Sequence, residues 1–170
     1  MHQSMTRRER RHILSRDVDS MHSGAHRIAT WVGKRMEAHC TSLGKCLIAH
    51  IPDEDVDRLI AERGLLRHNE HTIVSPARLK QELARVRTVG YALDDQEEEL
   101  GGRCIGAPDR NRDGRAGAAI SVAGTTEQIT AETITAIAAR VRQAAGAISK
   151  DLGYRDESNT PAPSSSCDAA

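Results

Sequence analysis

Aromatic residues are nearly missing from this sequence of 170 residues. They make up 2% of it, with no Phe, one Trp (Trp31) and two Tyr (Tyr91 and Tyr154). Proteins that bind single-stranded nucleic acid stack bases on aromatic side chains, so this composition argues against that class. The hydrophobic core must instead be built from Ala, Val, Ile and Leu.

An excess of charge of either sign is also missing. The sequence has 24 basic and 24 acidic side chains and a formal net charge of +0, so bulk charge does not indicate a nucleic-acid partner. No apolar run approaches the roughly 20 residues of a membrane-spanning helix. The N-terminus lacks the apolar core of a signal peptide. We therefore expect a cytoplasmic protein that makes no contact with membranes.

The four cysteines contain no Cys-x-x-Cys pair, and a chain of this length folds without disulfides. We expect reduced thiols. Metal ligands would have to come from His39, Cys40, Cys46, His68 and His71, whose spacing does not supply the four ligands of a structural zinc site. We predict no metal and no cofactor.

Helical and strand periodicities alternate along the chain and predict one domain of the α/β (α+β) class. Helix starts are marked by Thr41 or Ser42 and by Ser75-Pro76, and helix ends by Gly64 and Gly90. The predicted elements are, in order, strands at 13–19 and 26–32, helices at 42–49, 52–64 and 76–89, strands at 91–93, 103–107 (ended by Pro108) and 116–124, and a helix at 130–152 with Ile134, Ile137, Val141, Ala145, Ile148 and Leu152 on one side.

Residues 90–108, GYALDDQEEELGGRCIGAP, are the strongest candidate for a site. Two strand-like segments are joined by an acidic connection with paired glycines, which places Asp94 and Cys104 near each other at one edge of a sheet. Carboxylates and thiols are costly to bury without partners, so they mark sites more often than packing. We expect Asp94 to face inwards.

Catalysis by these groups is an alternative. A nucleophilic Cys104 needs a histidine and an electropositive setting, whereas the acidic neighbours raise its pKa, so an inert thiol is expected. Asp94 and Asp95 would suit acid–base chemistry, although clustered acids usually form a solvated surface. No catalytic residue is predicted, and a small enzyme using Cys104 or Asp94 stays an alternative.

The two ends of the chain are polar. Residues 1–12 carry a basic cluster, Arg7-Arg8-Glu9-Arg10-Arg11, which we interpret as a disordered arm. The alternative is that this arm contacts DNA phosphates. Residues 155–170 are rich in Ser and Pro and are predicted to be a disordered tail, with Cys167 in it.

Several segments together resemble the effector-binding domain of IclR-family bacterial transcriptional regulators, over roughly residues 13–154. The resemblance implies a GAF-like fold, with a curved antiparallel sheet, helices on both faces and a pocket for a small organic acid. The matching segments are residues 33–35, 39–45, 90–95, 102–108, 113–114, 118–124, 148–149 and 152–154.

The resemblance also implies which residues bind the ligand. Backbone N–H groups at the start of the helix that begins near Thr41 would bind a carboxylate, and side chains on the strands would line the rest of the pocket. Some family members carry a second Ser at the position of Ala123. The implied ligand-binding residues are Ser42, Leu43, Asp94, Cys104, Ser121 and Ala123.

The partners implied by the resemblance are a small organic acid and further copies of the same chain, as a dimer or tetramer. Family regulators bind DNA through a winged helix-turn-helix domain, and we expect that domain to be absent from this chain. The predicted function is therefore ligand sensing, in which an organic acid changes conformation or oligomerisation and so controls transcription.

Overall fold

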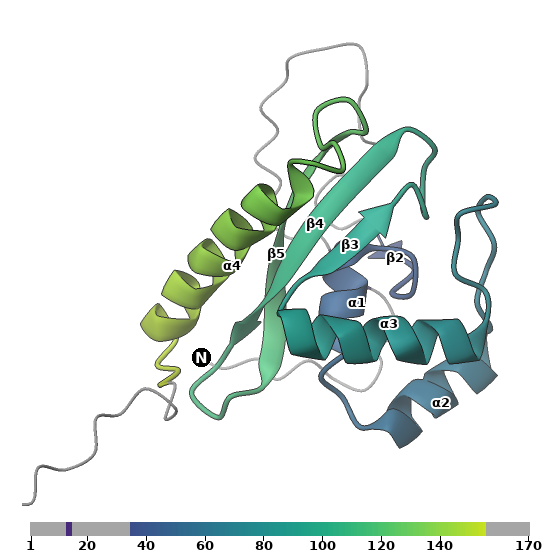
Figure 1. The fold of residues 1–170 in the computed structure, drawn as a ribbon. Coiled ribbons are helices and arrows are strands. Elements are labelled where there is room, and N and C mark those ends of the chain that lie inside the picture. Colours follow the sequence, from purple (N-terminus) through teal and green to yellow (C-terminus); the bar gives the residue numbers. More distant parts are fainter. Residues whose placement is uncertain (1–12, 15–34, 156–170) are drawn as a thin grey trace, which may run out of the picture.

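The structure is a computed structural model, and it describes residues 13–14 and 35–155 (Figure 1). The predicted strand at 26–32, most of the one at 13–19, the basic arm, the residues after 155 and Cys167 lie outside the described residues. The elements in chain order are β1 (Ile13–Leu14), β2 (Arg35–Met36), α1 (Ser42–Ile48), α2 (Asp53–Arg63), α3 (Pro76–Val89), β3 (Ala92–Asp95), β4 (Gly102–Arg110), β5 (Ala116–Thr125) and α4 (Ile134–Asp151).

The main sheet is an antiparallel meander in the order β3-β4-β5, while β1 and β2 form a separate antiparallel pair. In the register of the main sheet, Cys104 lies opposite Asp94 on one side and opposite Ala123 on the other. Because directly opposed residues point to the same side of a sheet, this register fixes which side chains share a face.

Each face of the sheet packs against a different set of helices (Figure 1). On one face Ala92 belongs to a core cluster with Leu83 of α3 and Cys46 of α1. On the other, Ile105 and Ala107 pack with residues of α4. The predicted class, an antiparallel sheet with helices on both faces, is confirmed. In the described part of the chain, no helix is both long and apolar enough to cross a membrane.

The predicted helix boundaries follow from local capping. The Thr41 hydroxyl accepts a hydrogen bond from the Gly44 N–H at 3.2 Å, and Ser75 accepts one from the Arg78 N–H at 3.4 Å. Gly90 ends α3 in the left-handed conformation, with φ of 77°, where a residue with a side chain would be strained.

The predicted strands required corrections, beginning with β2 (Arg35–Met36), which was not predicted. β3 extends through Asp94 and Asp95, so these two acids belong to the strand and not to the connection after it. β4 does not end at Pro108 but continues to Arg110. The ladder between β3 and β4 ends at Gly106, so at Pro108 the one described neighbour of β4 is β5. A proline is tolerated there because one side of the strand needs no hydrogen bond.

The final helix is shorter than predicted, and its buried stripe includes the predicted Ile134, Ile137, Val141 and Ala145 but departs from the prediction after Ala145. It begins at Ile134, and Ile148 and Leu152 are 37% and 46% exposed. The buried stripe ends instead at Ser149, whose hydroxyl donates to the Ala145 carbonyl at 2.7 Å and accepts from the Arg110 N–H at 2.9 Å. The polar residue Ser149 thus takes the buried position that the apolar pattern had assigned to Ile148.

The carboxyl group of Asp109, near the end of β4, is buried without a group that stabilises its charged form. Asp109 is 4% exposed, and its Oδ1 has no hydrogen-bond partner. Burial alone raises its pKa from 3.8 to about 6. Its ionised form is therefore less stable in the folded state than in the unfolded chain.

We expect Asp109→Asn to stabilise the protein in a pH-dependent way. Below pH 4 the Asp109 carboxyl is protonated in both the folded and the unfolded state, so the substitution should change the free energy of unfolding little. As the pH rises, the unfolded state ionises first and the native protein loses stability until about pH 6. Urea unfolding at pH 7.5 should give the variant an advantage of about 1–2 kcal/mol. An unchanged pH profile would contradict this account of Asp109.

Candidate functional site

The predicted strand residues share one face of the sheet. Asp94, Cys104 and Ala123 form one row across the three strands, and Gly106 and Ser121 belong to the next row. This is the face on which α1 packs, and we call it the α1 face. The register alone brings four of the six predicted ligand-binding residues to this side.

The start of α1 meets the α1 face at Gly106. A Cβ atom at Gly106 would lie 3.1 Å from the Ser42 carbonyl carbon and 3.2 Å from its oxygen, so glycine is what allows this approach. The Thr41 cap occupies the Gly44 N–H. The N–H groups of Ser42 and Leu43 come earlier in the helix and have no acceptor within it. They are the groups expected to bind an anion.

An open depression lies beside the Asp94–Cys104 row, at the end of the sheet where the acidic turn joins β3 to β4. The space enclosed in it is small, about 10 Å³, which is room for about one water molecule, and it opens directly to solvent. It is lined by Asp94, Glu98, Glu99, Gly102 and Cys104.

Asp94 is buried at the base of this depression, as predicted, with 6% of its surface exposed. Its Oδ1 accepts a hydrogen bond from the Glu97 N–H at 2.8 Å, which folds the turn back onto the strand. Burial raises the pKa of Asp94 to about 7, against the opposing effects of this hydrogen bond and of Lys45. The carboxyl therefore both caps the turn and faces the depression.

The turn is also held by a buried ion pair. Lys45 of α1 is 0% exposed, donates to the Leu93 carbonyl at 2.5 Å and pairs with Glu97. The Glu97 carbonyl in turn accepts from the Thr72 hydroxyl at 2.7 Å, and Asn69 donates to the Gln96 carbonyl at 2.9 Å. Lys45 thus ties α1 to the end of β3 and to the acidic turn, while Thr72 and Asn69 tie the connection between α2 and α3 to the same turn.

Cys104 is a neutral thiol in this setting. Burial, followed by the negative charges of Asp94, Glu98 and Glu99, raises its pKa to about 12. The prediction that acidic neighbours raise this pKa is confirmed, with burial as the larger cause. A thiol with this pKa is a poor nucleophile at neutral pH.

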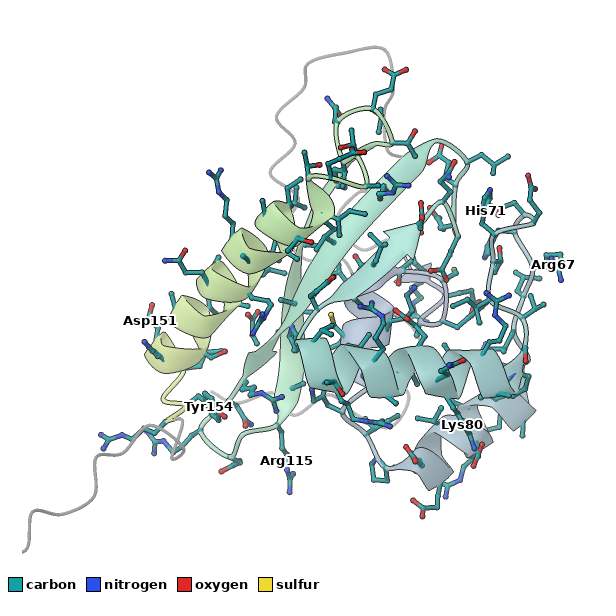
Figure 2. The ribbon with its side chains drawn as sticks, in the orientation of Figure 1. Arg67, His71, Lys80, Arg115, Asp151 and Tyr154 are labelled. Atoms are coloured by element: carbon teal, nitrogen blue, oxygen red, sulfur yellow. The ribbon has the colours of Figure 1, made fainter. Side chains whose placement is uncertain are left out.

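The histidines considered as metal ligands have other roles or lie elsewhere. His39 is buried and its Nε2 lies 3.0 Å from the Leu66 carbonyl oxygen, where it donates. Figure 2 shows His71 and Arg67 on the outer side of the connection between α2 and α3, away from the sheet. Across residues 13–14 and 35–155, no group of three or more His, Cys, Asp or Glu side chains is arranged to hold a metal ion.

The predicted site residues are not all equivalent. Asp94 and Cys104 line the depression, and Ser42 lies against Gly106 one row away. Leu43 is half-buried and packs on the core. Ser121 and Ala123 are exposed on β5, on the same face but outside the lining of the depression.

The sequence analysis did not identify four residues that line or support the depression. Glu98, Glu99 and Gly102 line the depression, although the acids of this connection were interpreted as a solvated surface. No role was predicted for Lys45. The available signal was its position between Gly44 and Cys46 in a short helix that buries most of its residues, because a buried lysine requires an acidic partner.

Residues 4–150 match the family described as bacterial transcriptional regulator IclR C-terminal. The chain belongs to this family. The transcriptional repressor IclR of Escherichia coli is 34% identical over 127 residues, which are 75% of this chain and 46% of that protein. The chain therefore spans about half the length of the curated relatives that it matches.

Solved structures of related regulators have the same fold, which confirms the GAF-like architecture that the resemblance implied. The repressor BlcR of Agobacterium tumefaciens has a TM-score of 0.73 at 28% identity, over 79% of this chain and 54% of that one. The inducer-binding domain of PobR from Acinetobacter, solved as a double mutant with 3-hydroxybenzoic acid, has a TM-score of 0.70 at 25% identity over 78% of this chain and 77% of that one.

We expect Lys45→Met to lower the free energy of unfolding by about 3–5 kcal/mol, because it leaves the buried Glu97 carboxylate without its cation. Glu97→Gln in the same chain should restore part of this loss, because it removes the uncompensated charge. Urea unfolding of the two single variants and the double variant measures the coupling. Simple additivity of the two effects would show that the pair does not act as a unit.

Proposed function

We propose that this chain is the part of an IclR-type transcriptional regulator that binds a small organic acid as effector. The observation that carries the proposal is the convergence of the start of α1 with the Asp94–Cys104 row on one face of the sheet, beside an open depression. A related inducer-binding domain, that of PobR, was solved with an aromatic hydroxy acid, which supports an organic acid as ligand class.

In this proposal each predicted residue has a physical task. The Ser42 and Leu43 N–H groups bind the carboxylate, because N–H groups at a helix start carry partial positive charge. Asp94 and Cys104 contact the opposite end of the ligand. Ser121 offers a hydroxyl from β5, and Ala123 leaves room beside Cys104 on the same row.

The regulatory effect would arise from differential binding. A ligand shifts a conformational equilibrium only by as much as it binds one state better than the other. We propose that the acid favours one arrangement of the domain or of an oligomer, a dimer or tetramer of this chain. The regulator would contact DNA through a winged helix-turn-helix domain. It would act in the cytoplasm, where bacterial genes are transcribed.

We further propose that the chain is a binding protein and not an enzyme. The thiol at the depression has a pKa of about 12, and the buried His39 is committed to the Leu66 carbonyl. The relatives that match are named as regulators of transcription. The domain would extend over residues 13–154, with the basic arm at residues 1–12 and the tail at 155–170 outside it.

The proposal predicts that Gly106→Ala weakens acid binding by displacing Ser42 from the sheet. A panel of small organic acids would be screened by thermal shift, since a ligand that binds the folded state raises the melting temperature. At least one acid should stabilise the native chain, and the variant should lose most of that shift.

Gly117→Ala provides the matched control, because a Cβ atom at Gly117 of the neighbouring strand β5 would meet no atom within 4 Å. This variant should keep the full shift. If no acid stabilises a native chain that melts cooperatively, the proposed function is wrong.

A further inference from the structure

We propose that His50 and Arg110 form an acid-sensitive contact between the end of α1 and the turn at residues 111–115, which joins β4 to β5. The contact holds while the His50 imidazole is neutral and opens when the ring takes up a proton. It lies at the far end of β4 from the acidic turn, where Figure 2 shows Arg115 and Tyr154. Such a switch would operate whether or not the chain binds an organic acid.

The two nitrogens of the His50 ring have partners of opposite kind. Nδ1 lies 2.9 Å from the Cys46 carbonyl oxygen, which only accepts a hydrogen bond. Nε2 lies 3.0 Å from Nη2 of Arg110, which only donates one. One form of the ring satisfies both contacts, the neutral imidazole with its proton on Nδ1. A second proton would sit on Nε2, where it removes the acceptor that Arg110 uses and sets two cations against each other.

Arg110 connects this histidine to elements on both faces of the sheet. Its Nη1 donates to the Gly114 carbonyl in the turn at 2.9 Å, and its backbone N–H donates to the Ser149 hydroxyl of α4 at 2.9 Å. His50 comes two residues after α1 ends and is tied to that helix by the Cys46 carbonyl. One residue at the end of β4 thus links α1, the turn and α4, and loss of the His50 contact frees the end of α1 from the turn.

The charged groups around His50 come from three other elements. Arg110 approaches from β4 and Arg87 from α3, and Arg87 itself pairs with Asp53 of α2 at 3.5 Å. Burial is the largest cause that lowers the pKa of His50, and Arg110 and Arg87 lower it further, against the hydrogen bond at Nδ1. The ring is therefore neutral at pH 7, and the contact is closed there.

Acid should open the contact. The unfolded chain protonates His50 near its ordinary pKa of 6.5, whereas the folded chain resists, so the fold loses stability as the pH falls below 6.5 until the folded ring is also protonated. Asp109, next to Arg110, has a pKa of about 6 and the opposite effect, because its protonation removes a buried charge. A test of the switch must therefore separate His50 from Asp109.

Nitrogen-15 NMR of the imidazole ring in the full chain measures the tautomer and the pKa of His50. At pH 7.5 the proton should be on Nδ1, and the titration should fall below pH 6.5. Arg110→Met should raise this pKa, because it removes the adjacent cation. A ring that carries its proton on Nε2 at pH 7.5 would overturn the assignment of the contact.

Hydrogen exchange then tests whether the proton opens the contact. Protection factors, corrected for the intrinsic effect of pH, are measured for the backbone N–H groups of Ala49, Asn111 and Gly114, each of which has a carbonyl acceptor. Ile105, buried in the middle of β4, is the reference. From pH 7.5 to 5.0 the three groups should lose about tenfold in protection relative to Ile105. An unchanged ratio overturns the proposal, whether nothing is lost or Ile105 loses as much through global unfolding.

Three variants identify the group responsible. His50→Gln keeps an oxygen that accepts from Arg110 but takes up no proton, so its protection ratio should not change with pH. His71→Gln is the matched control, because His71 is exposed on the connection between α2 and α3, and Asp109→Asn removes the neighbouring carboxyl that titrates in this range. Both controls should keep the response of the native chain. Persistence of the response in His50→Gln, or its loss in either control, would overturn the assignment to His50.

Discussion

The buried ion pair between Lys45 and Glu97 is the interaction on which the candidate site depends. Taking two charges out of water costs several kcal/mol per ion, and the mutual attraction offsets this only when further polar contacts are made. Here the Leu93 carbonyl accepts from the ammonium group, and the backbone of the turn is held by Thr72 and Asn69. Glu97 Oε2 nevertheless has no hydrogen-bond partner. The ion pair and the backbone contacts together fix the turn from which Glu98 and Glu99 face the depression.

This pairing also determines the electrostatics of the site. The Lys45 ammonium group is buried and paired with Glu97, and the side chains that line the depression are largely acidic. In the proposed function, the positive potential for an anionic ligand comes from the backbone at the start of α1, one row away.

The sequence predicts well those features that depend on neighbouring residues. The caps at Thr41 and Ser75 and the left-handed Gly90 were predictable because each acts within a turn of its own helix. The Lys45–Glu97 pair was not, because its members are 52 residues apart and only the packing of α1 against the sheet brings them together. The continuation of β4 through Pro108 depends likewise on where the ladder with β3 ends.

The two faces of the sheet are covered by helices of different lengths, and α3 packs beside α1 on the α1 face. α4 has 18 residues and spans about 27 Å, close to the roughly 33 Å of the ten-residue strand β5. α1 has 7 residues and spans about 10 Å. Ile105 and Ala107 of β4 are fully buried against α4, whereas β5 has exposed residues on both faces, Val122 on the α4 face and Ser121 and Ala123 on the α1 face. The proposed ligand site needs uncovered polar groups beside a helix start, and the hydroxyl of Ser121 is such a group on the α1 face.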